Sequence, residues 1–304
     1  MPRMLPLLVA AFLITGCSLL PVPSASTPPA PTKQAARPKP TATAKPRSKP
    51  SATPAPRRVL SDPPVGDAAR DRNPLNKLTK ARPRACKTPA VPYNSWRGMR
   101  NYLAAFASCL DRHWKAEFTR AGLKFQVPRR SFLSKPAKKA CGGWIKGATG
   151  LYCGDSRSKD YRRLWVLITK DDLYPEARIY MVDLIAHEYG HHVQEMSGFG
   201  DVTNRAYWRA DGEGKKAEDA VTRRSELQAQ CFSGIGLGVF YDALFPTPTT
   251  LDQYRESIVT WDQDNEWDRT HGLPRTQFTW FDRGFDQLRP AACDTWHARA
   301  ARVK

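Results

Sequence analysis

The stretch IYMVDLIAHEYGHHVQEM, residues 179–196, combines a regular apolar pattern with a cluster of chemically active side chains. Its apolar residues recur at helical spacing, at Met181, Leu184, Ile185, Tyr189 and Val193. Gly198 follows as a C-terminal stop. The pattern therefore predicts one apolar α-helix across this stretch.

Two histidines of this helix are spaced for metal binding. His187 and His191 are four residues apart, which places both imidazoles on one face of the helix, one turn apart. Their nitrogens can then converge on one zinc ion. Glu188 lies about 100° round the helix from His187, so it can reach a metal-bound water as a general base. A surface helix with two chance histidines is the alternative, but unpartnered imidazoles are costly on so apolar a helix.

The third ligand decides between classes of zinc site. A metzincin would have glycine and histidine where this chain has Gln194 and Ser197. Residues 217–244 combine good helix formers with closely spaced glycines, and they contain Glu226, 35 residues after His191. A carboxylate on a second helix completes the gluzincin ligand set, which is two histidines, one carboxylate and an open position for water.

We therefore expect one Zn2+ per chain, bound by His187, His191 and Glu226. Glu213 and Glu218 compete for the third place, but they lie in or near a charged, glycine-containing loop where solvated side chains are usual.

The elements around the active helix indicate a fold class. An apolar strand candidate at residues 164–168 precedes it, and strand followed by active helix is the order found in zincin proteases. Another helix is expected around Ser95 to Arg120. We predict an α+β, zincin-like domain that is mainly helical, has a small β-sheet and is disulfide-stapled.

The N-terminus is similar to a bacterial lipoprotein signal. The apolar run Leu5 to Thr15 is too short to span a bilayer but suits the core of a signal peptide. Ile14-Thr15-Gly16-Cys17 resembles a lipobox, whose cysteine is lipidated and becomes the new N-terminus. We expect residues 1–16 to be the signal peptide and Cys17 to carry the lipid. An ordinary signal peptide with a chance cysteine is the alternative.

Residues 17–85 are expected to form a disordered linker rich in Pro, Ala and Lys. Residues 21–61 hold eleven of the 26 prolines and no acidic residue, a composition that buries too little apolar surface to fold. Such a basic linker suits an anionic cell-envelope polymer. No recognised nucleic-acid motif accompanies the net charge of +19, so no nucleic-acid partner is expected. Residues 86–304 would then form the catalytic domain, outside the cytoplasm and lipid-anchored to the cell membrane.

Cysteine number indicates disulfides in this domain. Six of the seven cysteines follow Cys17, and an even number in an exported domain indicates three disulfides. Sequence alone does not choose among the 15 possible pairings. The short separation favours Cys141–Cys153. Cys231–Cys293 would then tie the metal-site helix to the C-terminal segment, which leaves Cys86–Cys109.

Several blocks of sequence resemble the bacterial neutral zinc metallopeptidase family over roughly residues 91–298. They are Ala140-Cys141-Gly142 with Leu151 to Asp155, His187 to Gln194, Arg224 to Ala229 with Cys231, and His271-Gly272, Trp280-Phe281, Gly284 and Cys293 to Trp296. The resemblance implies a zinc peptidase with peptide or protein substrates.

Gln230 departs from the family pattern, which usually has Asp at this place. In gluzincins generally, that acid accepts a hydrogen bond from a ligating histidine, and the amide oxygen of Gln230 could still accept one. The amide lacks the charge that raises ligand basicity, so the change Gln230→Asp is expected to keep or tighten zinc binding.

The other histidines of the domain lie outside the H-E-x-x-H motif. His271 is the best candidate for a donor to the oxyanion, because it stands beside Gly272 and recurs in the family block, while a structural or surface histidine is the alternative. His192 is expected to point away from the zinc face, either as a support behind the ligands or as a surface residue, and His113 and His297 are expected to be solvated.

The sequence therefore predicts an exported zinc metallopeptidase that hydrolyses peptide bonds with a zinc-activated water and Glu188 as general base. Two alternatives stay open, namely a catalytically weak lipoprotein that binds envelope components and a peptidase of peptidoglycan cross-links. The intact Glu188 favours an enzyme, because a degenerate binding relative would often lose it.

Overall fold

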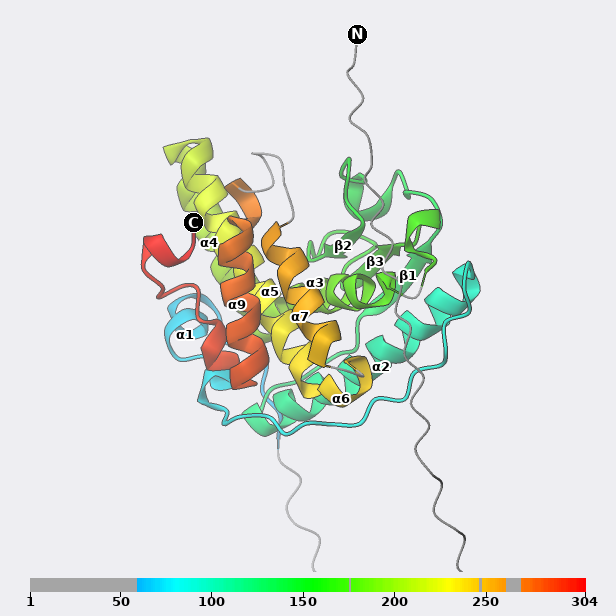
Figure 1. The fold of residues 1–304 in the computed structure, drawn as a ribbon. Helices are drawn as coiled ribbons and strands as arrows, with labels where there is room; N and C mark the ends of the chain where they lie inside the picture. Colours follow the sequence, from blue (N-terminus) through cyan, green and yellow to red (C-terminus); the bar gives the residue numbers. More distant parts are fainter. Residues whose placement is uncertain (1–58, 175, 246–247, 261–268) are drawn as a thin grey trace, which may run out of the picture. The chain divides into compact units, whose positions relative to one another are not determined.

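Helices dominate the computed structural model, which describes residues 59–304 except 175, 246–247 and 261–268 (Figure 1). Their bounds are α1 Gly66–Asp71, α2 Trp96–Ala121, α3 Ala177–Ser197, α4 Phe199–Ala210, α5 Lys215–Val239, α6 Tyr241–Leu244, α7 Pro248–Thr260 and α9 Pro274–Gln287. A small sheet consists of β1 Arg129–Leu133, β2 Gly150–Cys153 and β3 Arg163–Leu167. The predicted mainly helical fold with a small sheet is confirmed, and its zincin-like character stays a prediction.

β3 is the central strand of the sheet. It pairs in parallel with β1 and antiparallel with β2, in the order β1-β3-β2. Leu164 and Val166 of β3 are buried, as expected for the apolar strand predicted at residues 164–168. β2 lies at the edge of this sheet and contacts α3, so the sheet meets the predicted metal-binding helix along β2 (Figure 1).

α5 is a central helix that contacts both α3 and α9 (Figure 1). Small residues allow the close approach on each side. A Cβ atom at Gly190 of α3 would lie 2.6 Å from the carbonyl oxygen of Ala229 on α5. A Cβ atom at Gly284 of α9 would overlap the carbonyl oxygen of Cys231. The two contacts fix α5 at backbone distance between its neighbours.

The six cysteines of this unit lie in three pairs at disulfide distance. The Cα atoms are 5.7 Å apart for Cys86–Cys109, 5.3 Å for Cys141–Cys153 and 5.4 Å for Cys231–Cys293. These are the three pairs favoured by the sequence. As expected, Cys231–Cys293 joins α5 to the C-terminal segment.

The boundary predicted between linker and domain at residues 85 and 86 is wrong, because the folded unit begins earlier. Helix α1 and the following turn pack on the domain, and Leu75 has no exposed surface. The side-chain amide of Asn73 donates to the carbonyl oxygen of Ser197 at 3.0 Å, which satisfies a backbone group at the end of α3. Composition missed this docking, because a few apolar side chains and hydrogen bonds suffice to hold a segment that is poor in large apolar residues.

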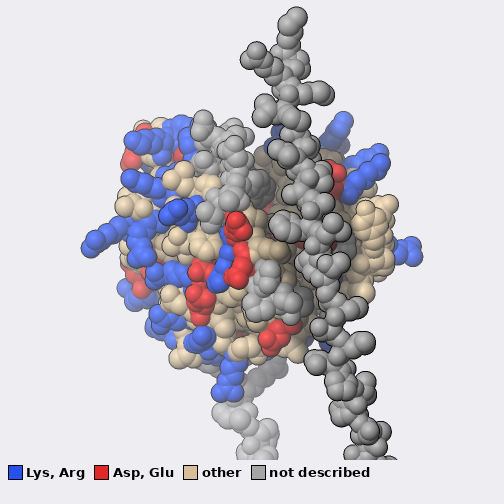
Figure 2. Space-filling model, in the orientation of Figure 1, with Lys and Arg blue, Asp and Glu red and all other residues tan. Residues whose placement is uncertain are grey.

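Other predictions concern residues that the structure does not describe. The signal peptide of residues 1–16, the lipidated Cys17 and the linker up to residue 58 lie outside the described residues. Among the described helices, none combines the length and the apolar character needed to cross a membrane. Figure 2 shows lysine and arginine side chains spread over the visible face of the folded unit, with acidic side chains among them.

His113 is wholly buried on α2, so the prediction that it is solvated is wrong. Its ring packs at 5.0 Å from that of Trp114 and 6.2 Å from that of Phe240. Neither ring nitrogen has a hydrogen-bond partner within the described part of the chain. Burial, assisted by the charges of Arg84 and Arg120, lowers the pKa of His113 to about 3. The sequence could not show this, because Phe240 comes from a distant part of the chain.

We expect the free energy of unfolding to fall as the pH drops below about 6.5. In the variant His113→Phe, the free energy of unfolding should fall less over the same pH range. The unfolded chain protonates this histidine near its ordinary pKa of 6.5, whereas the folded chain does so only near 3. Each such histidine therefore favours the unfolded state by up to about 1.4 kcal/mol per pH unit within that window. Buried His192, whose pKa burial also lowers to about 3, keeps part of the slope in the variant.

Urea unfolding of both proteins at a series of pH values between about 5 and 7 measures this slope. Phenylalanine keeps the apolar packing at this position and binds no proton. Equal slopes for the native protein and the variant would contradict a neutral His113 in the folded state.

Candidate metal centre

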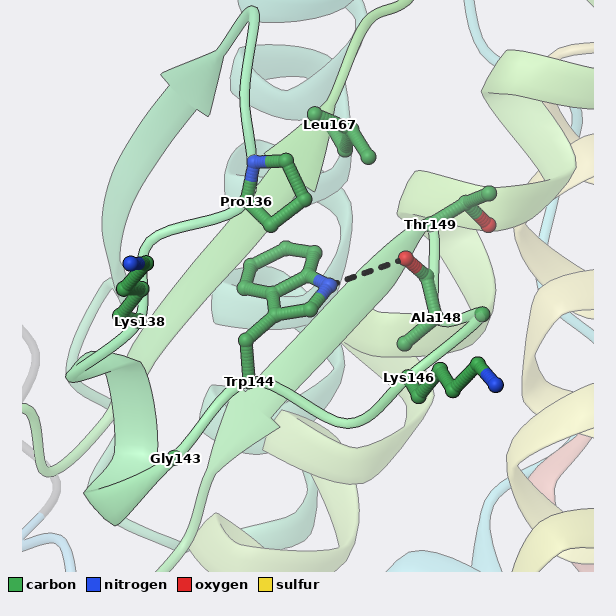
Figure 3. Close-up of a pocket in the computed structure, with 9 residues that line it drawn as sticks. Pro136, Lys138, Gly143, Trp144, Lys146, Ala148, Thr149 and Leu167 are labelled. Carbon is green, nitrogen blue, oxygen red and sulfur yellow. Dashed lines mark hydrogen bonds between the residues drawn. The ribbon is translucent and has the colours of Figure 1, made fainter.

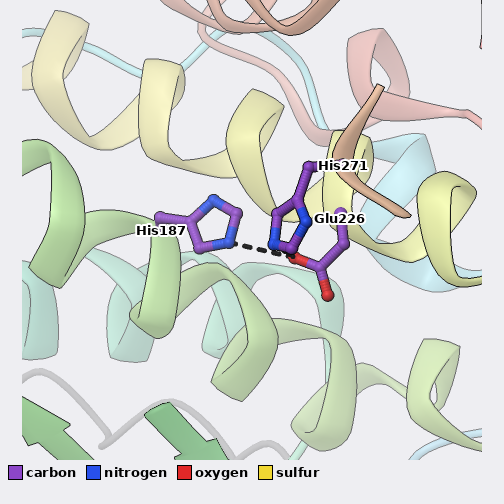
Figure 4. Close-up of side chains that lie close together, drawn as sticks. All are labelled: His187, Glu226 and His271. Atoms are coloured by element: carbon purple, nitrogen blue, oxygen red, sulfur yellow. Dashed lines mark hydrogen bonds and ion pairs between the residues drawn. The ribbon is translucent and has the colours of Figure 1, made fainter. Parts of the chain in front are cut away.

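The three predicted ligands meet between α3 and α5. Nε2 of His187 and Nε2 of His191 each lie 3.1 Å from the same atom, Oε2 of Glu226. All three side chains are largely buried, with exposed fractions of 15%, 19% and 16%. Figure 4 shows His187 of α3 facing Glu226 of α5. The close approach of the two helices at Gly190 therefore places both imidazoles on one carboxylate oxygen.

His271 joins this cluster from the segment before α9. Its Nε2 lies 3.5 Å from Oε2 of Glu226, and its ring stacks at 6.4 Å from that of His187 (Figure 4). One ligand atom from each of His187, Glu226 and His271 lies within 4.8 Å of the others. His271 is thus part of the site, and it is close enough either to bind a metal or to donate to a group beside it.

A glutamine amide holds the other ring nitrogen of each α3 histidine. Nδ1 of His187 lies 2.8 Å from Oε1 of Gln230, and Nδ1 of His191 lies 2.9 Å from Oε1 of Gln194. An amide oxygen only accepts, so Nδ1 donates in both rings and Nε2 faces the cluster. Metal binding through Nε2 requires this orientation of the rings.

The amide oxygen of Gln230 thus accepts a hydrogen bond from His187, one of the two histidines predicted as ligands, as the sequence allowed. Gln194 contacts a predicted ligand, a role that the sequence did not assign to it, since there it only excluded a metzincin and closed a family block. Its position three residues after His191, on the same helix face, is the signal that could have found it.

Glu188 is buried between the cluster and the edge of the sheet, with 7% of its surface exposed. A Cβ atom at Gly150, the first residue of β2, would lie 2.7 Å from Oε1 of Glu188. The absence of a side chain at Gly150 thus lets the carboxylate lie against the strand. Burial raises the pKa of Glu188, and the nearby charges of His191 and His187 oppose this rise.

Attraction between the imidazoles and the carboxylate shapes the electrostatics of the cluster. Burial by itself would raise the pKa of Glu226, but His191, His271 and His187 reverse this effect and hold it well below its usual range. Burial by itself would lower the pKa of His191, but Glu226 and Glu188 raise it to about 9. The site thus keeps Glu226 as an anion, deep enough to need a cationic partner.

The donor set fits zinc. Imidazole nitrogen and carboxylate oxygen are common zinc ligands, and both α3 rings are fixed through Nδ1 before any ion enters. The competing carboxylates are elsewhere, since Glu213 is exposed and Glu218 accepts a hydrogen bond from Tyr207 at 3.4 Å.

Two further histidines lie outside the cluster, and the expectation that His192 could be a surface residue is wrong, because it has no exposed surface. His192 faces away from the cluster, where Nε2 donates to the carbonyl oxygen of Gln126 at 2.7 Å and Nδ1 lies 3.0 Å from the hydroxyl of Tyr152. His192 is fully buried and so ties α3 to β2. His297 is exposed.

A surface hollow of about 580 Å3 adjoins β2 (Figure 3). It is lined by Pro136, Lys138, Trp144, Lys146, Thr149 and Leu167, among others. The indole N–H of Trp144 donates to the carbonyl oxygen of Ala148 at 3.2 Å, which fixes the ring. The hollow thus offers positive charge and an aromatic surface beside the start of β2.

The fold and the site define a protein in which two packed helices bring together two histidines and a glutamate, a donor set that suits a metal ion. A family model described as "Putative neutral zinc metallopeptidase" matches residues 78–240, which is more than half of the chain. The chain therefore belongs to the neutral zinc metallopeptidase family.

Curated relatives align with only part of the chain. The chain is 26% identical over 194 residues to "Uncharacterized protein YpfJ" of Escherichia coli (strain K12), which is 60% of this chain and 66% of that protein. It is 33% identical over 137 residues to "Uncharacterized protein Rv2575" of Mycobacterium tuberculosis (strain ATCC 25618 / H37Rv), which is 38% of this chain and 43% of that protein. The chain thus spans less than two thirds of the length of these relatives. No solved structure matches it significantly.

We expect the variant Gly190→Ala to weaken both the fold and the metal centre. The added methyl group would lie 2.6 Å from the Ala229 carbonyl oxygen and force α3 away from α5. Overpacking of this kind costs about 1–3 kcal/mol. A melting temperature several degrees lower than that of the native protein should follow in thermal unfolding.

Gly212→Ala is the matched control, since no heavy atom lies within 4 Å of a Cβ at that position. It should leave the melting temperature almost unchanged. A Gly190→Ala protein as stable as this control would show that the two helices do not pack at backbone distance.

Proposed function

We propose that this protein is an exported, lipid-anchored zinc metallopeptidase that hydrolyses peptide bonds. The observation that carries the proposal is the convergence of Nε2 of His187 and of His191 on Oε2 of Glu226, with Glu188 buried beside them. Membership of the neutral zinc metallopeptidase family supports the same chemistry.

Each residue of the cluster has a role in this mechanism. His187, His191 and Glu226 would hold the zinc ion, and the ion when bound supplies Lewis acidity that activates water and polarises the scissile carbonyl. Glu188 accepts the proton of that water and later returns it to the leaving amine. His271 donates a hydrogen bond to the developing oxyanion, and its ring is oriented by Thr270, whose Oγ1 lies 2.9 Å from Nδ1.

The features of the N-terminal sequence support an extracytoplasmic location at the cell membrane. A lipidated Cys17 would hold the protein there, and the basic, proline-rich stretch that follows would let it lie along an anionic envelope polymer. The variant Cys17→Ser should therefore leave the membrane fraction. Fractionation of cells that express both proteins measures this, and a variant that stays with the membrane would overturn the lipid anchor.

Two other functions use the same features differently. A peptidase of peptidoglycan cross-links would release peptides from purified wall fragments but leave casein intact. A catalytically weak lipoprotein would bind envelope components and cleave neither. Digestion of both substrates by the purified protein separates these functions from the proposed protein and peptide hydrolysis.

We expect the purified full-length protein to contain one zinc ion, which Glu226→Ala should lose. Glu188→Gln should retain the ion, because Glu188 faces the sheet edge and is not a ligand, but it should lower kcat for casein by at least about 100-fold. Metal analysis and casein digestion of the three proteins measure both effects.

His271→Ala distinguishes the two roles that its position allows. As an oxyanion donor, His271 can be removed with the zinc content unchanged and kcat lowered by about 100-fold or more. Loss of zinc in this variant would instead make His271 a ligand. A native protein that contains no zinc after purification without chelators would favour the catalytically weak lipoprotein.

A further inference from the structure

Asp183 lies one helical turn before His187 on α3 and is joined to it through α5. Nδ1 of His187 donates to Oε1 of Gln230 at 2.8 Å. The amide nitrogen of the same Gln230 donates to both carboxylate oxygens of Asp183, at 3.3 Å each. Gln230 is buried, since only 8% of its surface is exposed. The amide thus links a predicted zinc ligand to a carboxylate that the sequence analysis did not assign.

Within the residues that the structure describes, the side chains that donate hydrogen bonds to Asp183 carry no charge. Gln230 and Ser233 are neutral donors, and the hydroxyl of Ser233 donates to Oδ1 of Asp183 at 2.5 Å. The donors that the described residues offer to this carboxylate are an amide and a hydroxyl, and neither brings a positive charge. Burial and the charge of Asp183 raise the pKa of the nearby Tyr254 well above its usual range, so Tyr254 also stays neutral. A half-buried carboxylate surrounded by neutral groups needs a cation elsewhere.

His191 provides an internal comparison. Its Nδ1 donates to Oε1 of Gln194, and the amide nitrogen of Gln194 donates to the carbonyl oxygen of Ser225 at 2.8 Å and to Oε1 of Gln228 at 3.1 Å. These acceptors are neutral. The hydrogen-bond chain that starts at His187 is therefore the one that ends on a carboxylate.

We propose that Asp183 is a positioning residue for His187, and that it acts through Gln230 to orient the ring and to supply the negative charge that strengthens this nitrogen as a zinc ligand. In many metal sites a carboxylate contacts the ligating histidine directly. Here the Gln230 amide lies between the carboxylate of Asp183 and His187. This inference rests on the metal site of the proposed function but not on peptide hydrolysis.

The arrangement changes what is expected of Gln230→Asp. From the sequence alone, this change should keep or tighten zinc binding. In the structure, an aspartate at this position would place a second carboxylate next to Asp183, where the two like charges repel each other. The single variant should therefore bind zinc more weakly, and replacing Asp183 by asparagine in the same protein should relieve the repulsion.

Zinc affinity of the full-length protein, measured by competition with a chelating dye, tests the proposal without any peptidase assay. Asp183→Asn should weaken zinc binding by about 10- to 100-fold, the range seen when such partners of metal ligands are removed. Gln230→Asp should also weaken it. The double variant should return to within about threefold of the native affinity, because the new carboxylate then contacts His187 directly and accepts a hydrogen bond from the asparagine that replaces Asp183.

Glu195→Gln is the matched control, since it removes a carboxylate from the same helix. Glu195 accepts from Tyr161 and lies near Arg162, outside the cluster, so zinc affinity should not change. Thermal unfolding of the metal-free proteins shows whether each variant folds.

Each result has a distinct meaning. Native affinity in Asp183→Asn would overturn the positioning role and leave the metal site intact. Weak binding in both single variants without recovery in the double variant would show that Asp183 is only structural. A native protein without affinity for zinc would overturn the metal site itself, and with it this inference.

Discussion

The candidate metal centre depends on the packing of α3 against α5 at backbone distance. Gly190 and Ala229 form this contact, and the functional side chains flank it on both helices. His187 and His191 stand three residues before and one residue after Gly190, while Glu226 stands three residues before Ala229. A larger distance between the helices would separate the imidazoles from the carboxylate, so the three side chains could no longer meet at one point. Packing that is tight at one glycine is thus a condition for the chemistry.

The same contact organises a polar network inside an otherwise apolar interface. From His191, hydrogen bonds lead through Gln194 to Gln228, whose amide nitrogen donates to the carbonyl oxygen of Cys293 at 3.1 Å. Cys293 is the partner of Cys231 on α5. The ring of His191 is therefore held by a network that ends at a disulfide and involves both packed helices. Such a network specifies one arrangement of the helices, because every alternative would leave buried amides unpaired.

The sequence predicted the parts of the site that depend on local helix geometry. The spacing of His187 and His191 fixes their common face, and Glu226 followed from the apolar helix around it. His271 was expected near the site only through the resemblance of its block to the family, whereas the burial of His113 depends on contacts between distant segments that no local pattern contains. The predicted boundary between linker and domain was wrong for a related reason. Composition describes a segment on average, whereas this segment is held by single residues, the buried Leu75 and the hydrogen-bonded Asn73.

The amide between His187 and Asp183 also has an electrostatic consequence for the site. Glu226 and Glu188 already place two carboxylates beside the imidazoles, and a third in direct contact would add like-charge repulsion whenever the metal is absent. The Gln230 amide separates Asp183 from His187, and the greater distance weakens this repulsion. The same amide keeps the His187 ring oriented by hydrogen bonds. Ser233 satisfies the carboxylate on its other side without neutralising it. The arrangement therefore keeps the negative charge of Asp183 near His187. It also limits the electrostatic repulsion that this charge adds to the metal-free protein.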